Sequence, residues 1–187
     1  MAGVLALTMN DSAARLLDAA SGFAGLSPSD GLRPELRDRL DRGIVQRGDV
    51  SVWSGSVGNA ATAPSRFPDL TSWECTDSSF HLEDYVSVTI DTVDDEPRIS
   101  EPDQRILLQQ GIAAALQLRR LVYELDRPVP VRCIVSANET NATFRFHQIR
   151  PGESWNNPNL DAYLLEKVVI LDISPQHSAP GGAQKRA

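Results

Sequence analysis

Two groups of side chains in the sequence have the residue types that catalysis requires. The first is His81 with Glu83 and Asp84, which could supply a general acid or base. Residues 80–90 alternate between apolar and polar types, and in such a strand Asp84 would lie on the opposite side from the other two. Because the three groups would not converge, the sequence argues against catalysis here.

The second group is Cys133 with His147, which could act as a thiol nucleophile and its base on neighbouring strands. Cys133 lies in an alternating segment in which Val131 and Val135 share its side. That setting is typical of an inert buried thiol. A small enzyme or a small-molecule-binding domain that uses the His147 and Cys133 neighbourhood therefore stays the alternative function.

An acidic run at residues 91–96 contains Asp91, Asp94, Asp95 and Glu96. A helix-loop-helix calcium loop alternates its ligands and has a glycine at its sharp turn, and this run does neither. The sequence also lacks a glycine-rich phosphate loop followed by lysine. We therefore expect a solvated acidic loop, no metal site and no cofactor. Enzymatic activity is left open, with a non-catalytic role favoured.

The segment from Phe144 to Trp155 combines aromatic and arginine side chains, which protein interfaces favour as anchors. Phe144 and Phe146 alternate with the polar side of the strand, so we expect them in the core. Trp155 could instead cover the edge of the sheet. The predicted partner-binding side chains are Trp155, Arg150, Arg145, His147, Asp94, Asp95 and Glu96.

One long amphipathic helix must lie before these strands. Ser100 precedes Glu101, Pro102 and Asp103, a combination that favours the start of a helix. Apolar residues then recur at steps of three and four, and the small Gly111 lies in the middle of that side. The helix should end before Pro128. Its small central residues predict close packing on a sheet.

Five segments have strand patterns. We expect strands at residues 48–56, 80–90, 129–135, 143–149 and 164–173. The last contains Val168, Val169, Ile170 and Leu171 without alternation, which is typical of a central strand. The prediction is an α+β fold, with an antiparallel sheet of about four to five strands, the long helix packed on it and a short N-terminal helical segment.

We expect one domain at residues 9–174, divided into a helical segment (9–47) and a part with the sheet and main helix (48–174). Residues 1–8 are predicted to be an N-terminal tail and residues 175–187 a disordered C-terminal tail. Met9 is a plausible alternative start, because Asn10 or Ser12 could cap the helix that follows.

Net charge and composition restrict the partners. The chain has 187 residues and a net charge of −7, which argues against general nucleic-acid binding and favours a partner with a basic surface. No apolar run is long enough to span a membrane. Two isolated cysteines indicate a cytoplasmic protein. Self-association into a homodimer stays open.

The functional hypothesis is a small, acidic, intracellular protein-binding module. In type it is similar to the immunity and antitoxin-like inhibitors, which occlude the site of a partner. Here the acidic loop would steer a basic partner, and Trp155 would supply desolvated contacts.

Overall fold

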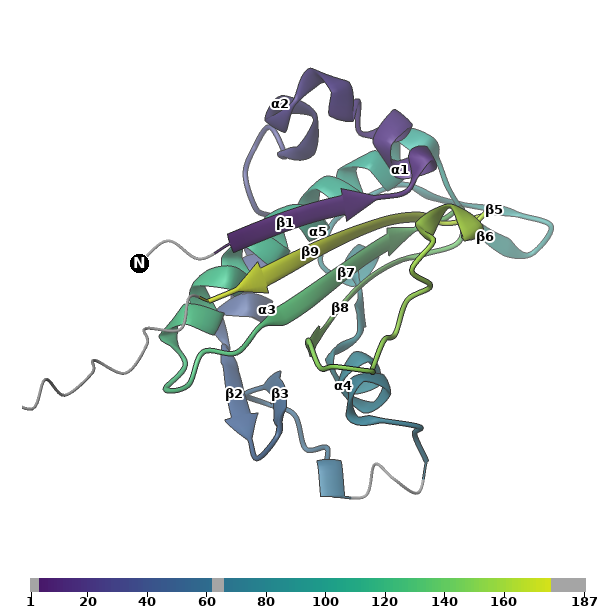
Figure 1. Ribbon diagram of the computed structural model, residues 1–187. Coiled ribbons are helices and arrows are strands. Elements are labelled where there is room, and N and C mark those ends of the chain that lie inside the picture. Colours follow the sequence, from purple (N-terminus) through teal and green to yellow (C-terminus); the bar gives the residue numbers. More distant parts are fainter. Residues whose placement is uncertain (1–3, 62–65, 176–187) are drawn as a thin grey trace, which may run out of the picture.

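A five-stranded antiparallel sheet crossed by one long helix forms the centre of the molecule (Figure 1). The structure, a computed structural model, describes residues 4–61 and 66–175. This arrangement confirms the predicted α+β class and the four to five antiparallel strands. In spatial order the strands are β1 (Val4–Met9), β9 (Lys167–Ser174), β7 (Val131–Ala137), β8 (Ala142–Gln148) and β4 (Phe80–His81).

The long helix α5 (Glu101–Glu124) begins as the sequence predicts. The Ser100 hydroxyl accepts a hydrogen bond from the backbone N–H of Asp103 at 3.3 Å, which caps the first turn. Gly111 lies against β7, and a methyl group added there would collide with the Val135 side chain. The helix backbone therefore approaches the sheet more closely than any residue larger than glycine would allow.

The two faces of the sheet differ in what covers them. One face packs against α5 and carries fully buried side chains, among them Cys133, Val135, Phe144, Phe146 and Leu171. The opposite face, called the free face below, carries the alternate residues of the same strands. In Figure 1 the yellow-green segment between β8 and β9 crosses this free face, while α5 lies behind the sheet.

The N-terminal segment differs from its prediction. Residues 4–8, expected in a tail, belong to β1, which pairs with β9 from Val4 opposite Ser174 to Met9 opposite Val169. Asn10 caps the next helix, as expected, by accepting a hydrogen bond from Ala13 N–H at 3.1 Å. Short helices follow: α1 (Asp11–Leu16), the 3₁₀ helix η1 (Ala19–Ser21), α2 (Phe23–Leu26) and α3 (Pro34–Asp41).

Two elements in the first half were not predicted as they are. The expected strand at 48–56 is the second half of a hairpin, made of β2 (Ile44–Arg47) and β3 (Val50–Trp53). The helix α4 (Leu70–Ser78) was not predicted; it begins after Asp69, whose carboxylate accepts a hydrogen bond from Ser72 N–H at 2.6 Å.

The long strand predicted at residues 80–90 is wrong. Only Phe80 and His81 pair with β8, and the chain then forms the 3₁₀ helix η3 (Leu82–Asp84). The turn is fixed because the Glu83 carboxylate accepts a hydrogen bond from the backbone N–H of Ala142 at 3.0 Å. Of the C-terminal tail predicted at 175–187, residues 176–187 lie outside the described residues.

Candidate functional site

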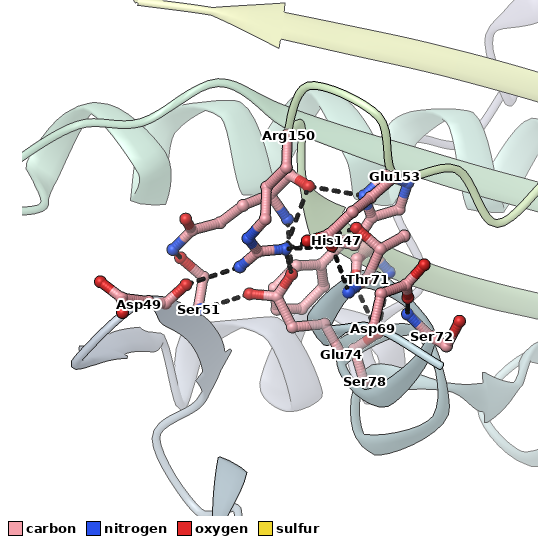
Figure 2. A network of polar contacts seen from close by, with 12 residues as sticks. Asp49, Ser51, Asp69, Thr71, Ser72, Glu74, Ser78, His147, Arg150 and Glu153 are labelled. Atoms are coloured by element: carbon pink, nitrogen blue, oxygen red, sulfur yellow. Dashed lines mark hydrogen bonds and ion pairs between the residues drawn. The ribbon is translucent and has the colours of Figure 1, made fainter. Parts of the chain in front are cut away.

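A buried carboxylate, Glu74, joins four segments of the fold (Figure 2). Its Oε1 accepts a hydrogen bond from Ser51 N–H at 2.6 Å, and its Oε2 accepts from Gln148 N–H at 2.9 Å. The Arg150 guanidinium lies 2.7 Å from the same Oε2 and also donates to the carbonyl of Asp49 at 2.6 Å. Glu74 thus ties α4 to β3, to the edge of β8 and to the loop after it.

This network occupies Arg150, which the sequence placed among the partner-binding side chains. Its side chain is only 14% exposed and satisfies a carboxylate that has no contact with solvent. A buried ion pair holds both groups in one geometry, because leaving either charge unpaired is costly. Arg150 therefore has a structural role and does not project outward.

His147, also predicted as a partner-binding side chain, is buried. The ring is 2% exposed, and Nδ1 donates to the Gln148 carbonyl at 2.7 Å. Nε2 has no hydrogen-bond partner among the described residues. Burial lowers the pKa of His147, and the nearby Arg132 and Arg150 add to that effect. The imidazole is therefore a neutral, inward-facing group.

The geometry gives no support to a Cys133 and His147 pair. Cys133 lies opposite Phe146 and faces α5, whereas His147 lies opposite Arg132 on the free face. Burial raises the pKa of the Cys133 thiol far above its ordinary value, and it raises the pKa of Cys75 to about 12. A thiolate that could be activated by this histidine is thus not available at either position.

His81, Glu83 and Asp84, the other predicted group, do not converge on one point in the structure. His81 contacts Glu83 at 3.2 Å, but the His81 side chain is 53% exposed and Asp84 is exposed as well. Within residues 4–61 and 66–175, no three histidine, cysteine or carboxylate side chains are placed to hold a metal ion. In the same ranges no helix is both long and apolar enough to cross a lipid bilayer.

The acidic run is a hairpin and not a loop. Strands β5 (Ile90–Val93) and β6 (Glu96–Ile99) pair across a turn in which Asp94 and Asp95 have φ angles of 53° and 65°. Aspartate is one of the few residues that tolerate this left-handed backbone. All four residues of β5 are exposed, including Ile90 and Val93. In Figure 1 the hairpin projects from one end of the sheet.

Two further segments meet the hairpin at that end. Arg98 forms an ion pair with Glu139 in the β7–β8 loop, and Ile99 N–H donates to the Glu139 carbonyl at 2.7 Å. Lys167, at the start of β9, lies 3.7 Å from Glu101. We call the surface formed by residues 90–103, 138–141 and 164–167 the acidic end.

The acidic end has a large excess of negative charge. It contains eight acidic side chains and two basic ones. Both basic groups, Arg98 and Lys167, are already paired with carboxylates of the same surface. The remaining acids, which include Asp94, Asp95 and Glu96, therefore present a net negative potential to solvent.

Two leucines lie exposed on the acidic end. Leu164 and Leu165 are 87% and 86% exposed and line a groove of about 470 Å³ with Arg98, Glu139 and Lys167. The sequence placed both leucines in the last strand, but β9 begins only at Lys167. The one local signal for exposure is the polar pair Glu166 and Lys167 directly after them, so this functional candidate was missed.

Trp155 and Arg145 meet on the free face, as two of the predicted interface residues. The Arg145 guanidinium carbon lies 5.2 Å from the centre of the Trp155 ring, and Trp155 is 39% exposed. Both line a cavity of about 330 Å³ that reaches Glu166. Glu166 also lines the groove beside the leucines, so the cavity and the acidic end are adjacent.

The segment that contains Trp155 and Asn156 covers this cavity and is bound to the sheet. Arg132 and Asp172 lie opposite each other on β7 and β9 and form a two-point ion pair with both distances 2.7 Å. Arg132 also donates to the side-chain oxygen of Asn156 at 3.1 Å. The residue next to Trp155 is thereby anchored on the sheet.

Comparison with known proteins gives a family but no function. The family model described as "Uncharacterized protein PM0498 family" matches residues 23–180, and the chain belongs to this family. No curated protein matches the chain. No solved structure matches it either.

Proposed function

We propose that this protein is an intracellular protein-binding module that docks a partner with a basic surface on its acidic end. The observation that carries the proposal is the adjacent pair Leu164 and Leu165, each more than four-fifths exposed at the rim of a strongly negative surface. A single exposed leucine is ordinary, but two neighbouring ones beside a groove form the apolar centre that interfaces need.

The charges and the apolar groups have different roles in this proposal. Uncompensated carboxylates on the β5–β6 hairpin would attract a basic partner and accelerate the encounter. Leu164 and Leu165 would then lose water on contact and slow dissociation. Trp155, in the adjacent cavity, would extend the apolar contact. Ile90 and Val93, both nearly half exposed on the hairpin, would add to it.

An inhibitor of the immunity type is the kind of binding module that we favour. A negative surface repels nucleic acid but complements an enzyme whose own substrate is anionic, because such an enzyme has a basic cleft. The hairpin projects from one end of the sheet (Figure 1), and in this proposal it enters the cleft of the enzyme. Occlusion of that cleft would block the enzyme without any chemistry by the inhibitor.

The test compares the full-length chain with two sets of variants in an affinity capture from the native host, quantified by mass spectrometry. Leu164→Ser with Leu165→Ser removes the apolar centre. Asp94→Asn, Asp95→Asn and Glu96→Gln remove charge, and asparagine keeps the left-handed turn. Val57→Ser is the matched control, because Val57 is 99% exposed outside the acidic end.

We expect one stoichiometric partner that the wild type and Val57→Ser retain equally. The leucine variant should raise its dissociation constant by about tenfold or more. The charge variant should lower the association rate and its dependence on salt. Equal retention by the leucine variant and the wild type would contradict the proposed surface, and no specific partner at all would contradict the proposed function.

A further inference from the structure

Three arginines lie on β7, on β8 and in the loop after β8, and they differ in their partners. Arg132 is paired with Asp172, and Arg150 is paired with Glu74, each at 2.7 Å. Arg145 makes no ion pair with any described residue. It donates a 3.1 Å hydrogen bond to the Thr143 hydroxyl, and its guanidinium lies against the ring of Trp155.

Arg145 is partly buried, and it lines a cavity instead of lying open on the surface. A charge that is removed from water without a counter-charge is unfavourable, so such groups are normally paired. The cavity of about 330 Å³ has room for a small ligand. Arg132 and Arg150 each have a carboxylate partner within the fold, whereas Arg145 has none among the described residues.

The rest of the cavity is suited to such a ligand. Hydroxyl and amide groups that can donate or accept hydrogen bonds come from Ser136, Asn141 and Asn156, while Ile134 and Val168 form an apolar floor. A few placed polar groups on an apolar wall are typical of small-ligand sites. Glu166 is the only acidic side chain of the lining.

We propose that this cavity binds a carboxylate group, with Arg145 as its counter-ion and the Trp155 ring holding the guanidinium in place. A guanidinium presents two parallel N–H donors that match a carboxylate, which gives both strength and orientation. Glu166 would favour ligands that also carry a cationic group, that is, small zwitterions. The cavity shares Asn141, Trp155 and Glu166 with the proposed partner surface or its rim, but binding of a small carboxylate can be measured on the chain alone, without the partner.

The test is a titration of the full chain followed by the fluorescence of Trp155. Trp53 and Trp73 are 2% and 6% exposed, so a ligand-dependent change should come from Trp155. The probes are butyrate, 4-aminobutyrate and butylamine at constant ionic strength. An acetylated and amidated glutamate is added to represent a side chain of a protein, so that a free ligand and a protein-borne carboxylate can be distinguished.

We expect saturable binding of the carboxylate probes, with butylamine at least about tenfold weaker. Arg145→Gln should weaken butyrate at least about tenfold, and Arg145→Lys should weaken it less. Glu166→Gln should strengthen butyrate and weaken 4-aminobutyrate. Arg119→Gln is the matched control, because Arg119 is also partly buried and stacked on an aromatic ring, that of Tyr123 at 5.7 Å, but lines no part of the cavity.

Several results would overturn the inference. Butylamine could bind as tightly as butyrate, Arg145→Gln could bind butyrate like the wild type, or no probe could give saturable binding. If Arg145→Gln does not fold, the opposite responses of the two probes to Glu166→Gln decide the question. Tighter binding of the glutamate derivative than of 4-aminobutyrate would assign the carboxylate to a protein side chain, and the reverse order would assign it to a free ligand.

Discussion

Glu74 and Arg150 form an ion pair of 2.7 Å in which the carboxylate has no exposed surface. The pair lies between α4 and the loop after β8, and the backbone N–H groups of Ser51 and Gln148 complete it. These donors explain why a charge can be buried here, since they replace the water that the carboxylate loses. The pair therefore holds α4, β3 and the loop after β8 together.

Replacement Glu74→Gln should lower the free energy of unfolding by about 3–5 kcal/mol, because it leaves Arg150 partly buried without its counter-charge. The amide can also no longer accept hydrogen bonds at both oxygen positions. Urea denaturation measures the effect. Arg120→Gln is the control, because its pair with Glu124 spans 3.8 Å with both side chains more than 60% exposed.

The control variant should change stability by less than about 1 kcal/mol. A Glu74→Gln protein as stable as the Arg120→Gln protein would show that the buried pair does not organise the fold.

Helices and strands with a local sequence pattern were predictable, and α4, which contains Glu74, was not. Helix α5 was predicted because its cap and its apolar stripe are local, and β9 because a continuous apolar run indicates a central strand. Helix α4 has no such stripe, since Glu74 and Ser78 point inward and bind β8. The backbone groups that satisfy them, at Phe146 and Gln148, are 68 and 74 residues away. A local pattern does not contain these partners.

Prediction of the candidate site was limited for the same reason. Arg145 and Trp155 were named from the sequence and do meet. Arg150 and His147 have the residue types of surface groups, but Arg150 is paired with Glu74 of α4 and His147 is buried. Leu164 and Leu165 have the composition of a strand, and only the start of β9 at Lys167 leaves them exposed.

Gly111→Ala should destabilise the protein although alanine favours helices by about 1 kcal/mol. The added methyl group would collide with Val135, and overpacking of a core costs about 1–3 kcal/mol. Combining it with Val135→Ala should recover part of the loss, which a double-mutant cycle in urea measures. Gly55→Ala is the control, since a methyl group there meets no neighbour.

Two results would contradict this prediction: a Gly111→Ala protein as stable as the wild type, or additive effects of Gly111→Ala and Val135→Ala. Either would mean that the space between α5 and β7 can accept a methyl group.

His147 should make stability depend on pH. Its pKa is lowered in the folded protein from an ordinary value of 6.5, so the unfolded chain takes up the proton first as pH falls. This contribution to stability is complete above pH 6.5 and declines below it, until the folded protein is protonated too. Denaturation curves between about pH 7.5 and pH 5 for the wild type and His147→Gln isolate the effect.

The wild type should lose more stability over this range than His147→Gln does. His81→Gln, at an exposed position, is the control for the loss of a histidine elsewhere in the fold. Parallel curves for the wild type and His147→Gln would mean that the ring can take up a proton inside the fold without cost.

A chain that starts at Met9 should be less stable than the full chain by about 2–4 kcal/mol, because it lacks residues 4–8 of β1 and with them the partly buried Leu5 and Leu7. It would also leave the apolar β9 as an unpaired edge, which favours aggregation. Thermal melts and light scattering measure both effects.

Asn10 stays in the short chain and still joins α1 to β9 through its hydrogen bond from Val168 N–H at 3.0 Å. Thr8→Ala, at an exposed position of β1, is the control for a change in this strand that removes no buried side chain. Equal melting temperatures for the long and the short chain would show that β1 contributes nothing to the fold, and would favour the sequence-based prediction of a tail.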